Sequence, residues 1–240
     1  ELAIAIVTLF ILVPHGTLQT APLVLTTLDW PPYEFEKPEG ELRGFDVEVL
    51  EAAFERVQIS IEFKFFPWNR SLKMAEQGVV SGVFSCSRSP DRDEFFIYSA
   101  PISQKTNGFF VRLDYDGFEP SKAEEAKGLK VGSVLGWAMA TMMQNVGAKL
   151  VTYRSEELVF KGLLSGTTNY AFLPMEGAKY RANLIGISKD VRFISISKLE
   201  LYLCFSKKWK NVEAIVQKFN EGLAEIRNNG TYDRIHAKYK

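Results

Sequence analysis

The sequence is short of the residues on which metal and nucleophilic chemistry most often depend. Its 240 residues include two histidines and two cysteines, and it contains no CxxC pair, P-loop or GxGxxG fingerprint. A histidine-based metal site or a Ser-His-Asp triad therefore has almost no material, and we expect neither a metal nor a cofactor. The two thiols, Cys86 and Cys204, are too few for a disulfide framework.

An excess of positive charge is also missing. Lys plus Arg and Asp plus Glu both number 29, so the formal net charge is zero. Nucleic-acid binders carry a basic footprint, and we therefore expect no nucleic-acid partner. The one basic run, at residues 207–210, is interpreted as a solvated corner. The composition is that of a globular chain, and the length suffices for one large or two ordinary domains.

Long apolar runs are absent after the N-terminus, where residues 2–13 carry no charge. This run is shorter than the roughly 20 residues that cross a bilayer, and it fits the apolar region of a secretory signal peptide. We predict a signal peptide over residues 1–21. The alternative is a buried first strand or helix.

From residue 23 onward, short apolar runs alternate with amphipathic segments. The first half predicts strand, helix, strand, helix and strand at residues 23–28, 45–57, 60–66, 70–78 and 79–85. The second half repeats this order at residues 129–134, 137–146, 149–153, 155–166 and 169–174. Such alternation favours an α/β fold with parallel sheets and helices on both faces.

Two segments are predicted to connect the halves. A strand at 108–113 with the polar stretch after it suits one crossing, and a strand at 199–206 suits the return. Two α/β lobes joined in this way imply a cleft, and ligands of open α/β sheets bind beyond the carboxyl ends of the strands. The segment SCSRSPDR, residues 85–92, follows the third strand and is therefore predicted to face the cleft.

Four segments, in order, resemble motifs of the bacterial extracellular solute-binding proteins, family 3. They are WPPYEFEKPEGELRGFD from Trp30, SCSRSPDR from Ser85, KGLKVGSVLGWAMAT from Lys127 and NEGLAEIRNNGTYDRIHAKY from Asn220. The resemblance covers roughly residues 23–240. It implies the two-lobed periplasmic-binding-protein fold of type II, whose hinge closes on a ligand without reacting with it.

The resemblance also implies the organisation of the lobes and the partners. Lobe 1 would comprise residues 22–110 and 201–240, and lobe 2 residues 111–200. The protein would be a periplasmic monomer of a Gram-negative bacterium. It would pass a carboxylate-bearing solute, an amino acid or a related metabolite, to an inner-membrane ABC permease.

The resemblance assigns the grip on the ligand carboxylate to Ser85, Ser87 and Arg92. An arginine fork suits a carboxylate bidentately, and hydroxyls add short donors. The alternative for Arg92 is a surface ion pair with Asp91 or Asp93.

Aromatic residues are predicted to enclose the ligand. Trp30 matches a position that covers the ligand side chain, and Trp68 would lie on the other side of it, whereas core packing is the alternative for each. Arg70 and Arg88 are candidates for a second anionic contact. Together with Trp137, the two tryptophans suggest a flat, aromatic or cationic moiety.

Lobe 2 departs from the pattern of amino-acid binders. Trp137 and Ala138 stand where those proteins have two small hydroxyl residues, and Met175 stands where an Asp takes the ligand ammonium. Either Glu176 takes the ammonium by a one-residue shift, or the ligand has no α-ammonium. Burying an ammonium without a partner would cost several kcal/mol.

Three questions stay open at the level of sequence. The protein could sense a ligand through a separate partner instead of delivering it. It could resemble the cyclohexadienyl dehydratases of this fold, with Glu176 as a general acid, although we expect no enzyme. Cys86 and Cys204 could form a disulfide, but two separate buried thiols are favoured.

Overall fold

The computed structural model describes residues 21–239. The predicted signal peptide at residues 1–21 thus lies outside the described residues except for its last one. Within the described part, no helix combines the length and the apolar character that crossing a bilayer requires.

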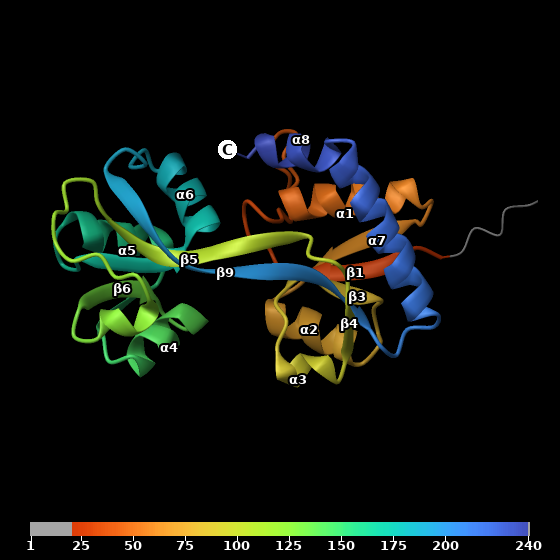
Figure 1. Ribbon diagram of the computed structural model, residues 1–240, viewed down its shortest axis with the longest axis horizontal. Coiled ribbons are helices and arrows are strands. Elements are labelled where there is room, and N and C mark those ends of the chain that lie inside the picture. The colour runs from red at the N-terminus through yellow and green to blue at the C-terminus, as the bar shows by residue number, and fades with distance from the viewer. Residues whose placement is uncertain (1–20, 240) are drawn as a thin grey trace, which may run out of the picture.

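Figure 1 shows two lobes joined by two long strands, with helices on both sides of each sheet. Lobe 1 consists of β1 (Leu23–Thr27), α1 (Phe45–Arg56), β2 (Ile61–Phe65), α2 (Trp68–Glu76), β3 (Gly82–Cys86), α3 (Pro90–Asp93), β4 (Phe96–Tyr98), α7 (Val212–Asn228) and α8 (Thr231–Ala237). Strands β2, β1 and β3 are parallel neighbours in that order, as the alternation of strands and helices predicts.

Lobe 2 repeats the same plan. It consists of the 3-10 helix η1 (Ala123–Ala126), β6 (Lys130–Val134), α4 (Ala138–Asn145), β7 (Lys149–Tyr153), α5 (Glu156–Leu164), β8 (Tyr170–Pro174) and α6 (Met175–Leu184). Strands β8, β6 and β7 are parallel neighbours in that order. The type II two-lobed fold expected from the resemblance is confirmed.

The two lobes are connected by β5 (Ser103–Arg112) and β9 (Val191–Ser206), which run antiparallel to each other. In lobe 1, β9 pairs with β3 and β4, and in lobe 2, β5 pairs with β8. The predicted lobe boundaries at residues 110 and 200 fall within these two strands.

The polar stretch after β5 does not make the crossing, contrary to the prediction. Tyr115, Ala123 and Ala126 of this stretch belong to an apolar cluster of lobe 2. The crossing is made by β5 itself, because its long antiparallel pairing with β9 satisfies the backbone groups of both strands over the whole span.

In lobe 1, α1 and α7 pack closely against each other. The rings of Phe54 and Phe219 lie 4.8 Å apart between their centroids, and both side chains are fully buried. A Cβ atom at Gly222 would come within 2.1 Å of the Ala53 carbonyl oxygen, so this glycine allows the two helices to approach.

Cys86 of β3 and Cys204 of β9 form a disulfide. The two strands are antiparallel neighbours in which Val83 pairs with Cys204 and Cys86 pairs with Tyr202, so the two thiols meet across the ladder. The favoured prediction of two separate buried thiols was therefore wrong. The sequence lacked the one fact that decides the matter, namely that β9 returns beside β3.

Candidate functional site

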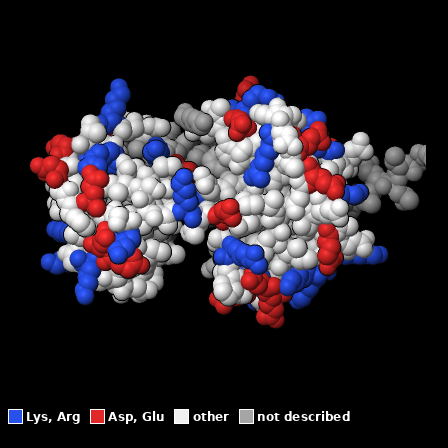
Figure 2. Space-filling model, viewed as in Figure 1, with Lys and Arg blue, Asp and Glu red and all other residues white. Residues whose placement is uncertain are grey.

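The molecular surface is notched between the lobes on the side where α2, α3 and α4 lie (Figures 1 and 2). Charges of both signs are interspersed over the face shown in Figure 2. The residues predicted to bind ligand follow the carboxyl ends of parallel strands in both lobes. Trp30 comes after β1, Trp68 begins α2 and Trp137 precedes α4.

Arg92 is held in place by the segment that follows β3. Its Nη1 donates to the Ser87 carbonyl oxygen at 2.7 Å and to Ser87 Oγ at 3.2 Å, and its guanidinium lies 5.5 Å from the centroid of Trp68. Burial lowers the pKa of Arg92. No carboxylate forms an ion pair with Arg92 among residues 21–239. Asp93 pairs with Arg88, and Glu76 and Asp91 act on Arg92 through their charges without pairing with it.

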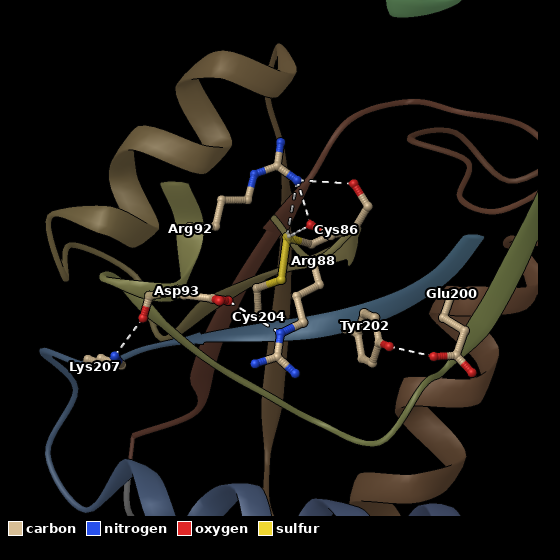
Figure 3. A network of polar contacts seen from close by, with 9 residues as sticks. Cys86, Arg88, Arg92, Asp93, Glu200, Tyr202, Cys204 and Lys207 are labelled. Atoms are coloured by element: carbon tan, nitrogen blue, oxygen red, sulfur yellow. Dashed lines mark hydrogen bonds and ion pairs between the residues drawn. A yellow bond between two sulfur atoms is a disulfide. The ribbon is translucent and has the colours of Figure 1, made fainter. Parts of the chain in front are cut away.

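Figure 3 shows that Arg88 and Arg92 lie on opposite sides of the Cys86–Cys204 disulfide. Arg88 Nε lies 3.3 Å from Asp93 Oδ1, and the Arg88 guanidinium lies 5.1 Å from the centroid of Tyr98. Arg88 is thus paired and exposed, whereas Arg92 is half-buried without an acidic partner.

Lys105 is a second cation near Arg92 that sequence reasoning missed. It lies on the crossing strand β5, half-buried, with Nζ 6.0 Å from the ring centroid of Trp30. Burial and then the charge of Arg92 lower the pKa of Lys105, while Glu176 acts in the opposite direction. No ion pair links Lys105 to a carboxylate in the described chain. The strand predicted from the sequence began at residue 108, after Lys105, so no sequence pattern pointed to this residue.

The predicted aromatic residues have different surroundings. Trp30 stacks on Tyr33 with centroids 4.2 Å apart, and Trp68 lies under Arg92. Trp137 packs against an apolar cluster of lobe 2. Arg70 is exposed, and its guanidinium lies 4.4 Å from the ring centroid of Phe66.

Glu176 connects α6 to the crossing strand. Its Oε2 accepts a hydrogen bond from the Thr106 backbone N–H at 3.0 Å. Burial, followed by the charge of Glu176, raises the pKa of Tyr33, which places this tyrosine beside the carboxylate. The hydrogen bond from Thr106 fixes Glu176 against the crossing strand, and the carboxylate keeps acceptor capacity for a further donor.

Ser85 turns its hydroxyl into the interior of lobe 1. Its Oγ lies 2.9 Å from Glu34 Oε2 and 2.6 Å from Asp46 Oδ2, and its backbone adopts a left-handed φ of 54°. Both carboxyl groups are fully buried. Of the three residues predicted to hold the ligand carboxylate, the structure brings together the side chains of Ser87 and Arg92 and commits that of Ser85 elsewhere.

A cavity of about 1040 Å³ lies between α6 and α8, on the other side of the crossing strands (Figure 1). Glu176 is the one predicted site residue that lines it. Two of its cations are already engaged, since Lys238 pairs with Glu48 at 2.5 Å and Arg227 donates to the Pro101 carbonyl oxygen. Lys179 also lines this cavity, whereas Arg92 and Lys105 do not.

The sequence model of the bacterial extracellular solute-binding proteins, family 3, matches residues 23–240. A "Probable histidine-binding protein" of Neisseria gonorrhoeae is 26% identical over 227 residues, which cover 90% of this chain and 81% of the relative. The "Histidine-binding periplasmic protein" of Escherichia coli K12 is 22% identical and covers 87% and 83%. Among solved structures, a histidine kinase sensor domain described as similar to periplasmic binding proteins has a TM-score of 0.72 at 23% identity, covering 92% of this chain and 96% of that one.

Proposed function

Because the chain belongs to the bacterial extracellular solute-binding proteins, family 3, we propose that it captures a small carboxylate-bearing solute between its lobes for an inner-membrane ABC permease. The observation that carries the proposal is Arg92. Ser87 orients its guanidinium, and Arg92 forms no ion pair with a carboxylate among the described residues. Export and capture of the solute in the periplasm are part of the same proposal.

Lys105 strengthens the case for an anionic ligand. Arg92 and Lys105 are half-buried like charges without an ion pair, so each raises the free energy of keeping the other charged. An anion bound between them would offset this repulsion. A carboxylate accepts two parallel hydrogen bonds from an arginine and one from a lysine.

The residues at the start of α6, Met175 and Glu176, differ in chemistry from the two cations proposed to hold the carboxylate. Met175 offers no charge to an ammonium where the resemblance places an Asp. The adjacent Glu176 is oriented toward β5 by its hydrogen bond with the Thr106 N–H. The arrangement therefore favours carboxylates without an α-ammonium over ordinary α-amino acids.

A thermal-shift screen of residues 22–240 tests this proposal. The panel contains amino acids, with histidine and arginine among them, aromatic acids, dicarboxylic acids and betaines. A ligand at about 100 times its Kd stabilises a protein by about 2.7 kcal/mol, which is a shift of several degrees at this size. We expect stabilisation by carboxylates that lack an α-ammonium. Hits restricted to α-amino acids would contradict that preference, and a panel without any hit would contradict the proposal.

The fate of the bound solute separates delivery from other roles. We expect the solute to be recovered unchanged after incubation, and its uptake to be lost when the gene is deleted. Unchanged uptake with intact binding would favour a sensing role through a separate partner. Conversion of the solute would show an enzyme.

Replacing Lys105 by Gln is expected to weaken binding of the best carboxylate hit about 10-fold to 100-fold. Hydrogen bonds to charged groups contribute about 1.5–3 kcal/mol, and Gln is a polar replacement that removes the charge. Titration calorimetry measures the change. Lys198→Gln is the matched control, because Lys198 is an exposed lysine on β9 that pairs with Thr106 of β5. Equal affinities of the two variants would remove Lys105 from the site.

A further inference from the structure

Two carboxyl groups lie side by side in the interior of lobe 1 and are bridged by one hydroxyl. Glu34 of the loop after β1 and Asp46 of α1 are both 0% exposed. Ser85 Oγ lies 2.9 Å from Glu34 Oε2 and 2.6 Å from Asp46 Oδ2. Thr27 Oγ1 lies 2.8 Å from Glu34 Oε1, and Ser103 Oγ lies 3.0 Å from Asp46 Oδ2. The network thus joins β1, the following loop, α1, β3 and the start of β5.

The number of hydrogens in this network is too small if both carboxyl groups are ionised. Four oxygen–oxygen contacts have hydrogen-bond length, but Thr27, Ser85 and Ser103 supply only one hydroxyl hydrogen each. One contact of Ser85 would then set oxygen lone pairs against each other. A hydrogen on Glu34 or Asp46 completes the set, because a protonated carboxyl can donate to Ser85 Oγ while Ser85 donates to the other carboxylate.

The surroundings oppose a double negative charge. Neither carboxyl group takes part in an ion pair with Lys or Arg within residues 21–239. The titratable groups that interact with the pair are Asp29 and Tyr33 from the loop after β1 and Tyr232 from α8. Beyond them, Glu176 of α6 acts on Tyr33, and His236 of α8 packs against Phe45, the neighbour of Asp46. Lys105 lies two residues after Ser103 on β5. Burial raises the pKa of Asp46 to about 7, and burial followed by repulsion from Asp46 raises the pKa of Glu34 well above its usual range.

We propose that Glu34 and Asp46 share a proton through Ser85 at neutral pH, and that the pair positions the ligand-binding segments of lobe 1. Ser85 stands two residues before Ser87, whose carbonyl and hydroxyl oxygens hold Arg92. Ser103 stands two residues before Lys105 on the same strand. The protonated pair therefore fixes the positions of the two segments that carry Arg92 and Lys105. Only this positioning role depends on the proposed function, whereas the shared proton does not.

Loss of the proton has a defined consequence. Two adjacent buried negative charges repel each other, and Ser85 can then satisfy only one of them. The folded pKa of each group is raised above its unfolded value of about 4. The stabilisation that the pair provides is therefore complete below pH of about 4 and is lost as the pH rises through about 7 and beyond.

Infrared spectroscopy at pH 7 tests the shared proton directly, because a protonated carboxyl has a C=O stretching band that an ionised carboxylate lacks. We expect this band in the wild-type protein and in Glu36→Gln, an exposed carboxyl of the same loop that serves as the control. It should disappear in Glu34→Gln/Asp46→Asn. If the double variant does not fold, each single variant should reduce or shift the band. Identical bands in the wild type and the amide variants would overturn the proposal.

Thermal unfolding between pH 5 and 9 provides the second readout. The amide introduced by Glu34→Gln cannot ionise. The unfolding temperature of this variant, relative to that of the wild type, should therefore increase by about 2–4 °C or more between pH 5 and pH 9. Glu36→Gln should follow the wild type throughout. A constant difference between the wild type and Glu34→Gln would show that the pair does not titrate in this range.

Hydrogen exchange of the peptide spanning residues 85–92 tests the positioning role without a ligand. After correction for the intrinsic rate, its protection should fall between pH 6 and 9 in the wild type and persist in Glu34→Gln. Unchanged protection in the wild type would refute positioning, even with the infrared band present. Failure of the carboxylate screen with these three results intact would refute the proposed ligand and leave the shared proton standing.

Discussion

Replacing Arg92 by Ala is expected to reduce the affinity for the best carboxylate hit by about 30-fold to several thousand-fold. Truncating one partner of a buried charge pair costs about 2–5 kcal/mol, because the remaining charge stays desolvated without its partner. Arg92→Lys should lie between the wild type and Arg92→Ala, since it keeps the charge and loses the fork that fits a carboxylate. Titration calorimetry on the purified variants measures these differences.

Arg88→Ala is the matched control for this prediction. Arg88 belongs to the same segment, but it points to the other side of the disulfide and pairs with Asp93 (Figure 3). Its removal should leave affinity unchanged. Because Arg92 also holds Ser87, circular dichroism must show that Arg92→Ala remains folded. A folded Arg92→Ala with wild-type affinity would refute the assigned carboxylate site.

Removing the disulfide is expected to cost about 3–5 kcal/mol of the free energy of unfolding. The bond joins residues separated by 118 positions, and closing a loop of about 100 residues lowers the entropy of the unfolded chain by an equivalent of about 4.7 kcal/mol. In Cys86→Ala/Cys204→Ala, this should lower the unfolding temperature by about 10 °C. Thermal unfolding followed by circular dichroism measures the effect, and the oxidised wild type is the reference.

Reduction separates the bond from the change of residues. A reductant should bring the wild type close to the double variant and should leave the double variant itself unaffected. Thiol titration of the denatured, unreduced protein should find no free thiol. Two titratable thiols would show that the bond does not form in solution.

The same bond should also matter for binding. Arg92 Nη1 lies 3.8 Å from Cys86 Sγ, and Ser87 follows Cys86 directly. The disulfide anchors the start of this segment to β9, so its loss should weaken ligand binding in addition to stability.

The two-lobed fold and one edge of the site could be predicted from the amino-acid order alone. Strands buried between two layers of helices need continuous apolar runs, and runs such as residues 79–85 and 169–174 can be recognised without long-range information. The segment from Ser85 to Arg92 follows such a strand, so its place at the cleft follows from the α/β plan. The helix α6 was not predicted, because its buried face consists of the small residues Gly177, Ala178 and Ala182 and gives little apolar periodicity.

The contacts between side chains that are distant in sequence could be read only from the folded structure. The path of β9 beside β3 created the Cys86–Cys204 bond, and the path of β5 brought Lys105 beside Trp30. The contact of Glu34 and Asp46 with Ser85 depends on a loop and a helix that are distant from β3 in sequence. Such contacts depend on strand order, register and loop conformation, and local propensity contains none of these. The sequence therefore located the segment that we propose binds a carboxylate, and the fold supplied the second cation and the buried pair that accompany it.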